Sequence, residues 1–131
     1  MSRLSHDPRT AKTGARGRLM PFNQCTIGVA REWPPHWERH PKGDELLHVL
    51  EGEVEVELLQ KNGRVAREIV SAGSFYVVPR GLWHRPIQRE PVVMLYVTPS
   101  AGTQATFADE APSVKRRRSP STGRRGAPRR R

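Results

Sequence analysis

Apolar and polar positions alternate most clearly at residues 53–59, where Val54, Val56 and Leu58 lie between glutamates. A period of two predicts a β-strand with one buried and one solvated face. Similar short apolar runs recur between turn signals such as Asn62-Gly63, and no segment shows a sustained helical period. We therefore predict strands at 24–31, 36–40, 45–50, 53–59, 65–70, 75–78, 84–88 and 92–97.

This succession of short strands is typical of an all-β sandwich or barrel. The composition changes at both ends, which contain few large apolar residues and are rich in Arg, Ser, Pro and Gly. We predict a disordered extension at 1–20, a β-barrel at 21–100 and a disordered Arg-rich tail at 101–131, with one turn of helix at 103–110. A further hypothesis places the true start of translation at Met20.

The net charge of +10 belongs to these ends, because residues 1–19 carry +4, residues 20–100 carry −1 and residues 101–131 carry +7. Such tails can bind phosphate groups without sequence preference. No aromatic residue lies among the terminal arginines to stack on bases, so we favour a solvated tail over nucleic-acid binding.

Cys25 is the one cysteine, which excludes an intrachain disulfide and fits a reducing compartment. No apolar run approaches the roughly 20 residues that span a bilayer. We therefore predict a soluble cytoplasmic protein with no membrane partner.

Candidate chemistry gathers in two places. If residues 36–40 are extended, His36, Glu38 and His40 share one face, and the turn at 41–44 brings Glu45 alongside. A second turn at Pro79–Gly81 presents His84 from a distant part of the chain. Two imidazoles and one or two carboxylates on a rigid sheet suit a divalent ion, and two His with one carboxylate is the arrangement of non-haem iron sites. Zinc, manganese and nickel fit nearly as well.

These residues resemble the two motifs of the cupin family. The first motif, H-x-H-x4-E-x6-G, is matched at His40, Glu45 and Gly52, with Glu38 in place of its first His. The second, G-x5-P-x-G-x2-H, is matched by Gly73, Pro79, Gly81 and His84. The resemblance covers about residues 25 to 98 and implies a small single-domain jelly-roll barrel.

By this resemblance His40, Glu45 and His84 are metal ligands. Glu38 replaces the missing His as a fourth ligand or, if it does not bind the metal, as a catalytic base, and His36 is the other candidate for the fourth ligand. The alternative is that these groups are merely hydrogen-bonded inside the barrel, but an ionised Glu45 buried without a counter-ion is costly. We expect His48, three residues after Glu45, to face away from the site.

The resemblance implies a metal-dependent enzyme of dioxygenase, isomerase or decarboxylase type that acts on a small polar molecule in the barrel. The alternative is a non-enzymatic module that senses or stores a small ligand or a metal. A homodimer is predicted from the resemblance and from exposed sheet edges.

Overall fold

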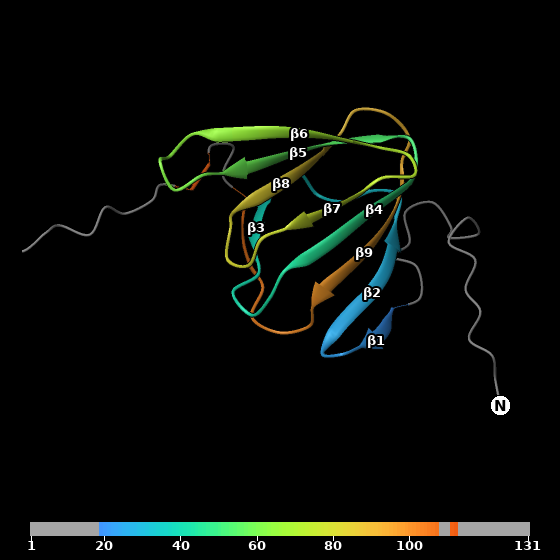
Figure 1. Cartoon of the computed structure of the whole chain (residues 1–131), viewed down its shortest axis with the longest axis horizontal. Helices are drawn as coiled ribbons and strands as arrows, with labels where there is room; N and C mark the ends of the chain where they lie inside the picture. The colour runs from blue at the N-terminus through green and yellow to red at the C-terminus, as the bar shows by residue number, and fades with distance from the viewer. Residues whose placement is uncertain (1–18, 108–110, 113–131) are drawn as a thin grey trace, which may run out of the picture.

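The computed structural model describes residues 19–107 and 111–112, and every regular element within these ranges is a β-strand. The strands are β1 (Met20–Phe22), β2 (Cys25–Ala30), β3 (Trp37–Arg39), β4 (Glu45–Glu51), β5 (Glu53–Leu59), β6 (Val65–Ser71), β7 (Phe75–Val78), β8 (His84–Gln88), β9 (Val93–Pro99) and β10 (Gln104–Thr106). They form two antiparallel sheets, ordered β1-β2-β9-β4-β7 and β10-β3-β8-β5-β6 (Figure 1). The predicted all-β jelly-roll fold is confirmed.

Three predicted strands, at 53–59, 75–78 and 84–88, are present with the predicted bounds. The bend expected at Glu51-Gly52 is also present, since the pairing of β4 with β9 changes register between Val49 and Glu51. These segments have turn residues such as Gly and Pro before and after them, so the sequence defines their ends.

The helical turn predicted at 103–110 is wrong in its described part. Gln104–Thr106 instead pairs antiparallel with Trp37–Arg39 and forms an edge strand. At the other end, β1 already begins at Met20, the last residue of the segment predicted to be disordered. The remaining predictions of disorder concern residues outside the described part of the chain, namely 1–18, 108–110 and 113–131.

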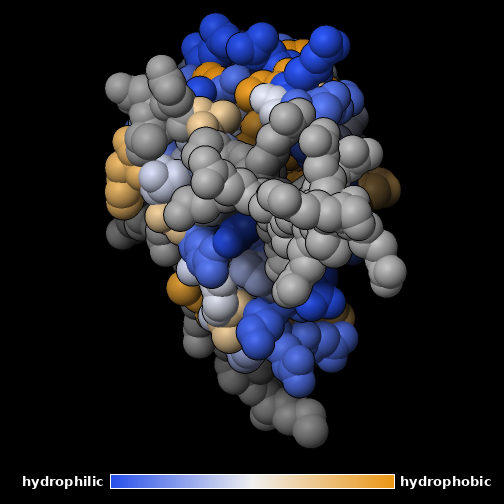
Figure 2. All heavy atoms as spheres, turned by 90° about the vertical axis from the view of Figure 1, so that its left-hand side faces the viewer, coloured by the Kyte–Doolittle hydropathy of each residue, from blue (hydrophilic) through white to orange (hydrophobic). Residues whose placement is uncertain are grey.

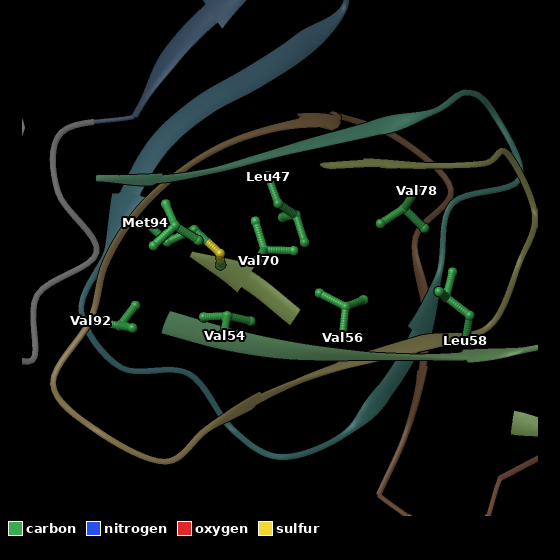
Figure 3. Close-up of a cluster of buried hydrophobic side chains, with 9 residues drawn as sticks. Leu47, Val54, Val56, Leu58, Val70, Val78, Val92 and Met94 are labelled. Atoms are coloured by element: carbon green, nitrogen blue, oxygen red, sulfur yellow. The ribbon is translucent and has the colours of Figure 1, made fainter. Parts of the chain in front are cut away.

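The hydrophobic core lies between the two sheets. Figure 3 shows side chains from both sheets pointing into this space, among them Leu47 from β4 and Val54 and Val56 from β5. All three are essentially inaccessible to solvent. Burying a Val or Leu side chain contributes about 1.5–3 kcal/mol. The glutamates that alternate with these residues in β5 form ion pairs instead, Glu55 with Arg89 and Glu57 with Arg85. Figure 2 shows hydrophilic side chains gathered at the top of the molecule, where β5 and β6 lie in Figure 1.

The two sequence motifs are joined through their turns. The Gly81 amide donates a hydrogen bond to the His40 carbonyl oxygen over 3.0 Å. The Arg80 amide donates to Asp44 Oδ1 over 2.8 Å, and the Arg80 side chain donates from Nε to the Pro41 carbonyl over 2.7 Å. Gly81 has φ of 75°, a conformation that favours glycine. These contacts hold the Pro79–Gly81 turn against the 41–44 turn and thereby place His84 beside His40.

Candidate metal centre

Four of the predicted site residues meet between the sheets. Glu38 and His84 are direct cross-strand partners in β3 and β8 of one sheet. His40 follows β3 directly, and Glu45 begins β4 in the opposite sheet. One ligand atom from each of these four side chains can be chosen so that all lie within 4.8 Å of one another. These four side chains form a group that could hold a metal ion.

Glu45 lies between the two imidazoles. Its Oε1 is 3.1 Å from His84 Nε2, and its Oε2 is 3.1 Å from His40 Nε2. Oε1 of Glu38 is 3.5 Å from His84 Nε2 and 3.7 Å from His40 Nε2. His40, Glu45 and His84 are buried, whereas the Glu38 side chain is 23% exposed.

Both imidazole rings are oriented through their other nitrogen. Nδ1 of His84 lies 3.0 Å from the Leu82 carbonyl oxygen, to which it donates a hydrogen bond. Nδ1 of His40 is hydrogen-bonded to the Thr103 hydroxyl over 3.0 Å. A metal-binding His usually engages its second nitrogen in this way, which fixes the ring and leaves the other nitrogen to the ion. Here that nitrogen is Nε2 in both rings.

The two carboxylates are also held by neighbours. The Thr98 hydroxyl donates a short hydrogen bond to Glu45 Oε2. His36 Nε2 lies 3.3 Å from Glu38 Oε2, so the other oxygen of Glu38 is the one that faces His40 and His84. His36 is therefore next to the group of four and is not a member of it.

The charges of the cluster stabilise one another. Burial opposes charge on every member, but the paired contacts outweigh it. Contacts with Glu38 and Glu45 raise the pKa of both His40 and His84 to about 9. The imidazoles in turn hold the pKa of both carboxyl groups below the usual range. Without a metal, these contacts favour the charged forms of the two imidazoles and the two carboxylates.

This donor set fits a divalent metal ion. His40 Nε2 is buried and has no hydrogen-bond partner among the described residues, because Glu45 Oε2 is close but badly aligned for a hydrogen bond. A buried nitrogen without a hydrogen bond is costly, and a bound ion would remove that cost. Two imidazole nitrogens with carboxylate oxygens suit zinc, iron, manganese or nickel. Glu38, His40, Glu45 and His84 are therefore the residues that would hold the ion.

A cavity of about 360 Å³ opens beside the cluster. Apolar walls come from Trp33, Leu47 and Met94, and Tyr96 adds an aromatic ring. The Trp33 indole donates a hydrogen bond to the Pro86 carbonyl over 2.9 Å, which fixes its ring in the wall. The cavity has the size and mixed character of a small-molecule site.

The sequence predicted that His36, Glu38 and His40 share one face of a strand. It also predicted that Glu45 and His84 lie near them. It missed Thr98 and Thr103, which contact the cluster from 53 and 63 residues away in the chain. Single hydroxyl residues carry no sequence signal for such a role. His48 has only partial burial and pairs with Phe75 and Leu95 on the side of its strand opposite Glu45, as expected from strand alternation.

The family model of the cupin domain matches residues 26–98, more than half of the chain. The chain therefore belongs to the cupin family. Germin-like protein subfamily 2 member 2 of Arabidopsis thaliana is 34% identical over 83 residues, which covers 57% of this chain and 37% of that protein. The chain spans 22–49% of the length of the germin-like relatives that it matches.

Two solved structures show the same fold. A cupin-2 domain containing protein from Shewanella frigidimarina has a TM-score of 0.54 and 20% identity, covering 70% of this chain and 85% of that one. Oxalate oxidase in complex with the substrate analogue glycolate has a TM-score of 0.51 and 23% identity, covering 64% of this chain and 46% of that one. Among the described residues, no helix is long and apolar enough to cross a membrane.

Proposed function

We propose that this cupin binds one divalent metal ion through Glu38, His40, Glu45 and His84 and acts on a small molecule in the adjoining cavity. The observation that carries the proposal is a group of four ligand atoms in which the buried His40 Nε2 lies beside Glu45 without a hydrogen bond. Membership of the cupin family and the cavity beside the group support it. The reaction types that we propose are those of a dioxygenase, an isomerase or a decarboxylase.

The side chains would divide the work as follows. His40 and His84 offer Nε2 because Thr103 engages Nδ1 of His40 and Leu82 engages Nδ1 of His84. Glu45, held by Thr98, supplies an oxygen from the opposite sheet. When bound, the ion would polarise an oxygen of the small molecule as a Lewis acid.

Glu38 has two roles open to it. As a ligand, it would use the oxygen that faces the imidazoles. As a base, it would accept a proton from the small molecule while His36 holds its other oxygen, 3.3 Å away. Its partial exposure toward the cavity suits the second role, since a base must reach the proton that it removes.

A non-enzymatic binding or sensing module is the second candidate. Two carboxylates would cancel both charges of a divalent ion, and this weakens the ion as a Lewis acid. Such a site would hold a metal or a small ligand without turnover. A cytoplasmic location stays a prediction, and the basic clusters that motivated nucleic-acid binding lie outside the described residues.

Calorimetric titration with Mn²⁺, Zn²⁺, Ni²⁺ and, without oxygen, Fe²⁺ tests the metal proposal. We expect saturation at one ion per chain and a loss of at least about 100-fold in affinity for His84→Ala, because one of two nitrogen ligands disappears. His48→Ala is the matched control and should bind normally. Absence of saturable binding in the wild type would refute the proposal.

Oxygen uptake and product analysis on the metal-loaded protein separate the two candidates. Turnover of a small hydroxylated or carboxylated compound, lost in His84→Ala, supports an enzyme. Ligand binding without turnover across the same compounds supports a binding module.

A further inference from the structure

The cavity beside the proposed metal site is acidic. Glu32, Glu38 and Glu45 line it, whereas no Lys or Arg among the described residues does. Glu38 and Glu45 would already match the two charges of a divalent ion. Glu32, which is exposed, adds a further negative group to the lining.

A negatively charged ligand would therefore enter without a Lys or Arg partner from the described lining. The nearby carboxylates would repel it, and the ion would attract it less because its charge is already balanced. The other side chains of the lining favour cationic or neutral ligands. The aromatic residues Trp33 and Tyr96 line the cavity, and aromatic rings attract cations. The hydroxyls of Thr26 and Ser100, which bond each other over 2.8 Å, add hydrogen-bonding groups.

We propose that the cavity selects a small neutral or cationic molecule with hydroxyl or amine groups and discriminates against carboxylates. The inference rests on the proposed metal site and names the ligand class of that site. It sets this chain apart from the structurally similar oxalate oxidase, whose structure holds the carboxylate glycolate. The feature responsible is Glu38, which places a carboxylate where the family motif has a neutral imidazole.

Three probes of similar size and different charge test this ligand class: glycolate, glycolamide and ethanolamine. Each is titrated into zinc-loaded protein of measured zinc content, and dissociation constants are taken from chemical shifts of the ¹⁵N-labelled chain. We expect glycolate to bind about tenfold or more weakly than the other two probes, the scale of one nearby charge in a partly solvated site.

Glu32→Gln removes one lining carboxylate without touching a proposed ligand, and it should bring glycolate several-fold closer to glycolamide. Glu90→Gln, which changes an exposed glutamate outside the lining, should leave the ranking unchanged. Glycolate binding as tightly as the other probes, or no measurable binding of glycolamide and ethanolamine, would overturn the proposal. Zinc content far below one per chain would instead count against the proposed metal site.

Discussion

Stability of the metal-free protein should depend on pH through the cluster of His40, His84, Glu38 and Glu45. Both imidazoles have a folded-state pKa of about 9, against 6.5 for an unperturbed His. Between these values the folded protein holds more protons than the unfolded chain, so a rise in pH favours unfolding. The stabilisation is complete below pH 6.5 and is lost as the pH rises through 9. The carboxylates act oppositely, and their contribution is lost as the pH falls below their ordinary value of 4.5.

The size of the effect follows from the shift in pKa. One pKa unit corresponds to about 1.4 kcal/mol, so a single imidazole contributes about 3 kcal/mol. Both imidazoles face the same two carboxylates, and we therefore expect a combined loss of about 3 kcal/mol between pH 6.5 and 9. In a domain of this size that lowers Tm by about 10–20 °C.

Thermal melts in EDTA from pH 5 to 9.5, followed by circular dichroism, measure this dependence. His84→Gln should flatten the decline above pH 6.5, and His48→Gln should leave it unchanged. Saturating zinc should remove the decline, because metal binding requires deprotonated imidazoles and strengthens as the pH rises. A metal-free wild type whose Tm is constant or increases from pH 6.5 to 9 would refute the reasoning.

Three further predictions concern single side chains. Thr98→Val removes the hydrogen bond to Glu45 and should weaken metal affinity about tenfold in chelator competition, and unchanged affinity would speak against the role of Thr98. Leu47→Ala should lower the free energy of unfolding by about 2–5 kcal/mol in urea titrations, because Leu47 is 1% exposed in the core. A smaller decrease in the free energy of unfolding would contradict this packing. Gly52→Ala should lower the free energy of unfolding by at least about 1 kcal/mol in the same titration, since φ is +80° and a Cβ would collide with the Pro91 carbonyl oxygen. An unchanged free energy of unfolding would contradict that geometry.

Alternation and turn residues predicted the middle of the fold well. In β5 the alternation of buried valines with glutamates indicates both the strand and its orientation, and the Asn62-Gly63 turn indicates where it ends. The solvated face predicted for this strand is only partly present, because Glu57 is buried. The edge strands were less predictable. Gln104–Thr106 contains no alternation, and its pairing with β3 decides its structure. Tertiary contact thus overrode a weak local preference.

Strand geometry predicts which side chains of the candidate site share one side of a strand. A period of two puts Glu38 and His40 on one side, and the structure brings them together with Glu45 and His84. Which of His36 and Glu38 comes closer to His84 depends on the pairing of β3 with β8, which the sequence does not specify. The role of Glu38 as ligand or base stays a prediction.

Elemental analysis of the purified native protein tests the central claim most directly. Our account predicts about one divalent ion per chain in the wild type and in His48→Ala, and almost none in His40→Ala and His84→Ala. A wild type without bound metal after supply of all four candidate ions, or equal metal content in all four proteins, would contradict it.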